Sequence, residues 1–221
     1  MRLPEDLAHM ITLFTTCFQM AWQELAYSKS AKEDGLGEFY SVATNNYIKS
    51  MGVGLVILIP SIFIIYPLMV NEAYGVGKEL IPFYLLGTIL STISSFLGNT
   101  FSAIKKNQLL FITMLIGSVA NVVCIHLLLP KLGLQASNVA LAIGFLLICI
   151  TRLVLLKKEL HISIEYRNIV IVIIGFIGVT TAYQYGNLWQ NIVVMLVALA
   201  LIFYFFKDVF HMVLQKVRNR G

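Results

Sequence analysis

Residues 83–145 read FYLLGTILSTISSFLGNTFSAIKKN (83–107), QLLFITMLIGSVANVVCIHLLLPKLGLQ (108–135) and ASNVALAIGF (136–145). The first two apolar segments are separated only by Ile104-Lys105-Lys106-Asn107, and a third follows Pro130-Lys131-Leu132-Gly133. Each segment is close to the roughly 20 apolar residues that cross a bilayer core as a helix. Because both connections are too short to be domains, we expect these helices to pass back and forth through one membrane.

The first of these segments carries small residues at every third or fourth position, which places them on one face of a helix. Apolar burial cannot drive helices together in lipid, so small residues that let two backbones approach closely mark a packing face. We therefore predict that this helix lies at the packed centre of a bundle. The residues of the stripe are Gly87, Ser91, Ser94, Ser95, Gly98 and Ser102.

The composition of the whole chain agrees with a membrane protein. Of its 221 residues 58% are hydrophobic and 12% are charged, whereas soluble domains are about 25% charged. The apolar runs lack the alternation of a transmembrane barrel, so the predicted fold class is an all-α integral membrane protein. The net charge of +5 is expected to report membrane topology rather than nucleic-acid binding.

Seven membrane-spanning helices are expected along the chain. A hydrophilic loop at 28–50 is expected to be part helix at the membrane surface. After the last span, residues 207–221 place apolar residues on one helical face and charged residues on the other, the pattern of an amphipathic helix on an anionic surface. The predicted spans are residues 7–27, 51–70, 81–103, 109–129, 136–156, 168–185 and 188–206.

The distribution of basic residues predicts the orientation of these spans. With seven spans, every Lys and Arg except Arg2, Lys78 and Lys131 falls on one side of the membrane. The positive-inside rule then places the C-terminus in the cytoplasm and the N-terminus outside. No cleavable signal peptide is evident, and the span at 7–27 is the least apolar. We therefore expect this chain to correspond to the C-terminal part of a longer transporter.

Several short sequence patterns occur along the chain in an order that is typical of a family of membrane transporters. They are FTTCFQMAWQELAYS (14–28), Phe39-Tyr40-Ser41, Ile81-Pro82-Phe83, Phe96-Leu97-Gly98, and Asn121 followed by Leu128, Pro130 and Gly133. Over about residues 10–156 the chain resembles the flippases for O-antigen and capsule repeat units. These belong to the multidrug/oligosaccharidyl-lipid/polysaccharide exporter superfamily.

The resemblance implies a transporter of the bacterial inner membrane that moves undecaprenyl-diphosphate-linked oligosaccharides for lipopolysaccharide or capsule biosynthesis. It implies two six-helix lobes that alternate access to a central cavity, of which this chain would be most of the C-terminal lobe. The expected partners are the lipid-linked oligosaccharide, membrane lipids, and a separate N-terminal lobe or a second copy of the chain.

Two sets of polar residues in or beside the spans are functional candidates. The first set would line the substrate cavity, although Glu24 could simply be hydrated at the interface and the amides could bond between helices. The second set would bind the diphosphate headgroup, although such cations also act as topology anchors. The cavity candidates are Gln19, Gln23, Glu24, Asn99 and Asn121, and the headgroup candidates are Lys105, Lys106 and Arg152.

The sequence contains no arrangement typical of catalysis. Cys17, Cys124 and Cys149 lie in apolar runs without metal-ligand spacing, so no metal, cofactor or catalytic residue is predicted. The alternatives to a flippase are a multi-span polysaccharide polymerase or lipid-sugar transferase, and a truncated remnant that does not transport. The short loops expected on the outer side argue against the enzyme.

Overall fold

The computed structural model describes residues 35–69 and 75–200, and every regular element in these ranges is a helix. The predicted span at 7–27, the tail at 207–221 and the last residues of the span at 188–206 lie outside the described residues. The helices are α2 (Leu36–Met69), α3 (Gly75–Ala103), α4 (Asn107–Leu132), α5 (Gln135–Leu160) and α6 (Tyr166–Tyr185), followed by the shorter helix Leu188–Ala200.

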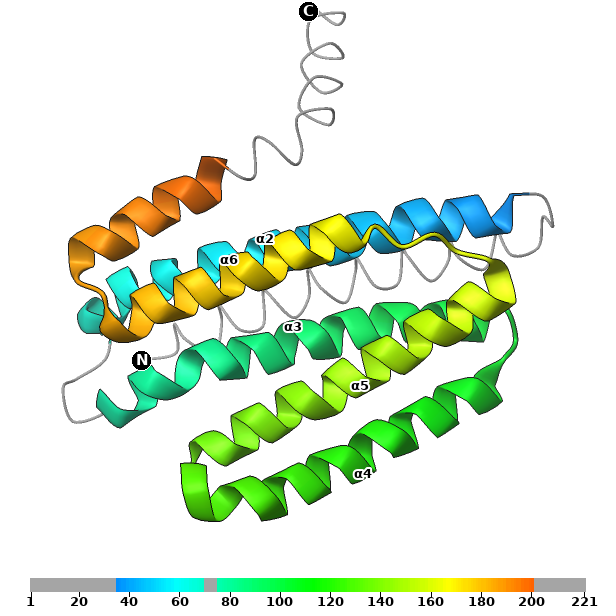
Figure 1. The fold of residues 1–221 in the computed structure, drawn as a ribbon, viewed down its shortest axis with the longest axis horizontal. Helices are drawn as coiled ribbons and strands as arrows, with labels where there is room; N and C mark the ends of the chain where they lie inside the picture. The colour runs from blue at the N-terminus through cyan, green and yellow to red at the C-terminus, as the bar shows by residue number, and fades with distance from the viewer. Residues whose placement is uncertain (1–34, 70–74, 201–221) are drawn as a thin grey trace, which may run out of the picture.

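The five long helices run back and forth along one axis (Figure 1). α5 packs against α3 and α4, whereas α6 packs against α2. The α3–α4 and α5–α6 connections lie at the same end of this bundle, which we call the basic end because it carries Lys105, Lys106, Lys157, Lys158 and Arg167. The opposite end holds the α4–α5 connection, the start of α3 and the end of α6.

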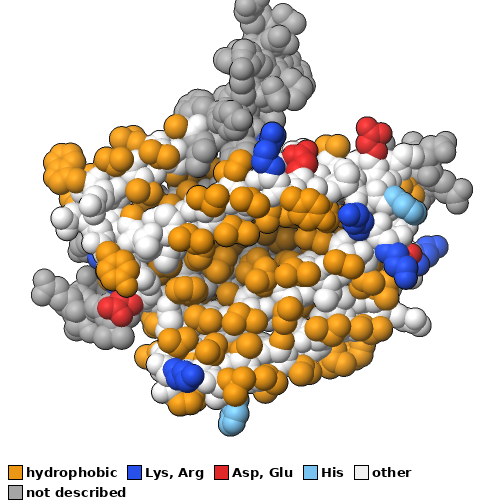
Figure 2. Space-filling view, viewed as in Figure 1, with side chains coloured by type: hydrophobic (Ala, Val, Ile, Leu, Met, Phe, Trp, Pro, Cys, Tyr) orange, Lys and Arg blue, Asp and Glu red, His pale blue; other side chains and the backbone are white. Residues whose placement is uncertain are grey.

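All five long helices are long and apolar enough to cross a membrane. Much of their apolar surface faces outward, as Figure 2 shows for one face, with charged side chains mainly around its margins. On α4 the exposed side chains include Phe111, Leu115, Val119, Val122 and Leu127. Soluble monomers rarely expose apolar patches this continuous, and the surface of the described part of the chain is compatible with a membrane protein.

The segment at 28–50 is helical from Leu36, in line with the part helix expected there. It is not a separate surface element, however, because α2 begins at Leu36 and continues to Met69. Tyr40, Thr44 and Tyr47 recur at the spacing of one helical face, and all three are buried. The Tyr47 ring stacks on Phe96 of α3 at 4.0 Å between centroids. With 34 residues, α2 is about 50 Å long and exceeds the roughly 30 Å hydrocarbon core of a bilayer.

Within the described residues, the predicted spans at 51–70, 81–103, 109–129, 136–156 and 168–185 are confirmed as helical, with ends that differ by a few residues. α3 begins six residues before position 81, and α5 extends four residues beyond position 156. The added turns are polar, such as Gly75–Leu80 and Lys157–Leu160. Hydropathy marks the part of a helix that can lie in lipid, whereas backbone hydrogen bonding continues into the polar residues on either side.

The small-residue stripe of α3 packs as predicted, mainly against α5. A Cβ atom added at Gly87 would lie 2.9 Å from Leu141 Cδ2, and one added at Gly98 would lie 2.8 Å from Arg152 Nη1. Ser94 is buried, whereas its neighbour Ser95 is exposed. The stripe therefore brings α3 close enough to α5 for Arg152 to reach the α3 backbone.

Candidate functional site

Arg152 lies inside the bundle, where α3, α4 and α5 meet. Its side chain is only 2% exposed. The Nε atom donates a hydrogen bond to Thr113 Oγ1 of α4 at 3.0 Å. Nη1 donates to the Ser94 carbonyl oxygen at 2.5 Å and to Ser94 Oγ at 3.1 Å. One side chain on α5 thus bonds to both neighbouring helices.

The charge of Arg152 is solvated by these oxygens rather than neutralised. Arg152 forms no ion pair with any carboxylate in the described part of the chain. An ionised group within a membrane span is costly and commonly has a functional role. A carbonyl and two hydroxyls lower that cost through charge-assisted hydrogen bonds, but among the described residues they leave the positive charge without a counterion.

The predicted span 136–156 places Arg152 about one turn from its end, but α5 continues eight residues beyond Arg152, to Leu160. Glu159 lies two helical turns further along α5, which is about 10 Å. It forms an ion pair with Lys106, the residue that precedes α4. Lys105 is exposed in the same α3–α4 connection, with a left-handed backbone φ of 59°. The three headgroup candidates therefore occupy two depths, with two lysines at the basic end and the arginine inside.

Asn99 and Asn121 also lie apart. Asn99 is half-buried, one turn before the end of α3 at the basic end. Asn121 is 14 residues into α4, about 20 Å from the beginning of that helix. It lines a groove of about 300 Å³ with Ser118, Gly144 and several apolar side chains of α4 and α5. The other cavity candidates, Gln19, Gln23 and Glu24, lie outside the described residues.

The connection between α5 and α6 is held against α2 by hydrogen bonds. Asn45 Nδ2 donates to the Ser163 carbonyl oxygen at 2.8 Å, and Asn45 Oδ1 accepts from the Glu165 backbone N–H at 3.0 Å. Ser41 Oγ accepts from the Ser163 N–H at 2.9 Å. His161 and Glu165 border a polar cavity here. No group of three or more His, Cys, Asp or Glu side chains within 35–69 and 75–200 could hold a metal ion.

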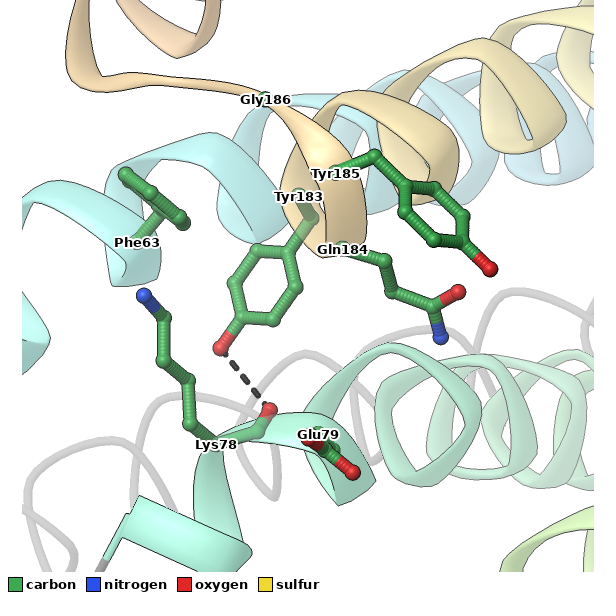
Figure 3. A pocket seen from close by; sticks show the side chains of 7 residues that line it. All are labelled: Phe63, Lys78, Glu79, Tyr183, Gln184, Tyr185 and Gly186. Carbon is green, nitrogen blue, oxygen red and sulfur yellow. Dashed lines mark hydrogen bonds between the residues drawn. The ribbon is translucent and has the colours of Figure 1, made fainter.

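A cavity at the opposite end was not predicted from the sequence. It has a volume of about 450 Å³ and lies between α2, α3 and α6 (Figure 3). Its lining includes Phe63, Lys78, Glu79, Tyr183 and Gln184. In the sequence, Lys78 enters only the count of basic residues that predicts the membrane orientation. Spacing along the chain gives no sign that three helices bring these side chains together.

Similarity to known proteins does not assign a family to this chain. Comparison with protein-family models, with curated proteins and with solved structures finds no match to this chain.

Proposed function

We propose that the chain is embedded in the bacterial inner membrane with its basic end in the cytoplasm. Support comes from five helices long and apolar enough to cross a bilayer and from the charges that flank them. Lys105, Lys106, Lys157, Lys158 and Arg167 lie at the basic end, and Lys78 and Lys131 lie at the opposite end. This asymmetry is the one that the positive-inside rule relates to the cytoplasmic side. The predicted spans at 7–27 and 188–206 would bring the total to seven.

We further propose that the chain acts in a flippase for lipid-linked oligosaccharides, as the C-terminal lobe of a two-lobed transporter. The observation that carries this proposal is the buried Arg152 beside Gly98. Gly98 belongs to the Phe96-Leu97-Gly98 pattern that resembles the family, and it leaves the space that the guanidinium occupies. A cation that has no carboxylate partner among the described residues, within a membrane bundle, favours a negatively charged substrate such as a diphosphate.

In this mechanism the two depths of positive charge act in sequence. The exposed Lys105 at the basic end would meet the diphosphate first. Arg152 is covered by α3 and α4, so it would contact the headgroup only when these helices move relative to α5. Rocking of helix groups around a site within the bilayer is the usual form of alternating access.

Complementation tests the proposal in a bacterium that lacks its own repeat-unit flippase. The chain is expressed alone and together with a matched N-terminal lobe, and surface polysaccharide is measured. We expect polysaccharide to return when both lobes are present, and we expect Lys131→Ala, a charge removed at the opposite end, to leave that rescue intact. Rescue by the chain alone would instead indicate a cavity built from two copies.

A complete lack of rescue would contradict the proposal, provided that the chain is found in the membrane fraction. Accumulation of polymerised polysaccharide without a separate polymerase would favour the enzymatic alternative.

A further inference from the structure

We propose that the cavity between α2, α3 and α6 binds the headgroup of a zwitterionic phospholipid, with phosphatidylethanolamine as the best fit. The inference rests on the proposed insertion in a membrane and does not depend on oligosaccharide transport. The volume of about 450 Å³ falls within the roughly 300–1,000 Å³ of small-molecule sites, so a headgroup can enter without rearrangement of the helices.

The amine of Lys78 is positioned to receive a phosphate. Lys78 Nζ lies 3.9 Å from the centroid of the Phe63 ring and 5.9 Å from that of Tyr183. The Tyr183 hydroxyl donates a hydrogen bond to the Lys78 carbonyl oxygen at 3.0 Å, which fixes the backbone from which the amine extends (Figure 3). Lys78 forms no ion pair with the described residues. An ammonium group has three donors, so its hydrogen bonds remain available for phosphate oxygens.

Glu79 supplies the opposite charge on another wall of the same cavity. Its side chain is exposed, and Figure 3 shows it directed away from the amine of Lys78. A carboxylate accepts hydrogen bonds from a primary ammonium group. Gln184 also lines the cavity and adds an amide to it.

The two charges together favour a ligand that carries both signs. A singly anionic headgroup would be attracted by Lys78 but repelled by Glu79. A singly cationic headgroup would be attracted by Glu79 but repelled by Lys78. Charges arranged in this way select a partner partly by rejecting others. The primary ammonium of ethanolamine can donate hydrogen bonds to Glu79, which the methylated ammonium of choline cannot do.

The cavity also lies at the level where headgroups would be found. Lys78 lies in the first turn of α3, and Tyr185 is the last residue of α6. Tyr185 is 84% exposed and Trp189 is 77% exposed, as is usual for aromatic residues at a membrane interface. Beyond the cavity, Figure 2 shows apolar side chains over α5 and α6, with a hollow between the two helices. Acyl chains can lie along such a surface.

Native mass spectrometry of the full chain tests this site. The protein is reconstituted with equal amounts of phosphatidylethanolamine and phosphatidylglycerol, extracted in mild detergent, and analysed for the lipid that remains bound. We expect phosphatidylethanolamine to be retained in preference. We expect Glu79→Lys to shift the ratio about tenfold toward phosphatidylglycerol, the effect of about 1.4 kcal/mol, because the cavity then carries two positive charges.

Lys131→Glu is the matched control, since it reverses a charge at the same end but outside the cavity. It should leave the retained ratio unchanged. Equal retention of the two lipids by the unmodified chain would overturn the proposal, as would a preference that Glu79→Lys does not alter. Displacement of the lipid by a soluble disaccharide would also overturn it and would identify a carbohydrate site. Because lipid retention requires no transport, failure of complementation would leave this result unaffected.

Discussion

Replacement of Arg152 by alanine is expected to destabilise the helix bundle by about 2–4 kcal/mol. The substitution removes hydrogen bonds to Ser94 and Thr113 and leaves a cavity where three helices meet. Part of this loss is offset because the charge no longer has to be buried. The measurement is reversible unfolding of the purified full chain in mixed micelles, followed by its helical circular dichroism.

A second substitution at Arg152 distinguishes packing from charge. Arg152→Met fills most of the same volume without charge, and apolar replacement of a buried charged group is often nearly neutral for stability. We expect it to be more stable than Arg152→Ala but inactive in complementation. Full complementation by Arg152→Met would show that the charge has no part in transport.

Lys157→Ala is the control on the same helix. Lys157 is exposed, so its removal should change the free energy of unfolding by less than about 0.5 kcal/mol. If Arg152→Ala changed the free energy of unfolding as little as Lys157→Ala does, the hydrogen bonds at the junction of the three helices would not contribute to stability.

Replacement of Gly144 by alanine is expected to destabilise the contact between α4 and α5 by about 1–3 kcal/mol. An added Cβ atom would lie 2.9 Å from the Gly117 carbonyl oxygen and 3.1 Å from Asn121 Cβ, both on α4. The first is a backbone atom, so the two helices must separate to admit the methyl group. The same unfolding measurement, made on the purified variant in the same mixed micelles, gives the size of the effect.

The matched control is the same substitution at Gly178 of α6. A Cβ atom there has nothing within 4 Å, and alanine is a better helix former than glycine by about 1 kcal/mol. Gly178→Ala should therefore be neutral or stabilising. Equal effects at the two positions would contradict close packing of α4 on α5.

The helical fold could be predicted because its signals are local. Runs of apolar residues mark the spans, and the spacing of Gly87 and Gly98 marks the face of α3 that meets α5. The early start of α2 was missed because polar residues around Tyr40 and Tyr47 lower the mean hydropathy of this segment, although the two tyrosines form a buried face. That face has the 3.6-residue period of a helix, so periodicity rather than mean polarity could have found it.

The candidate sites were less accessible to prediction, because each combines residues that are distant in the chain. Arg152 could be singled out as an ionisable residue, but its partners Ser94 and Thr113 lie on other helices. Its depth also depended on where α5 ends. The cavity at Lys78 and Tyr183 required three helices to be placed side by side. Sequence pattern gives the face of a helix but not which faces meet.

Cysteine labelling in intact cells tests the membrane orientation most directly. The native Cys17, Cys124 and Cys149 are replaced by alanine, and single cysteines are introduced by Ser163→Cys at the basic end or Leu134→Cys at the opposite end. Both positions are exposed. With the outer membrane permeabilised and the inner membrane intact, a membrane-impermeant maleimide should label the variant at 134. The variant at 163 should react only after the inner membrane is opened. Labelling of the variant at 163 in sealed cells, or recovery of the chain in the soluble fraction, would contradict the account.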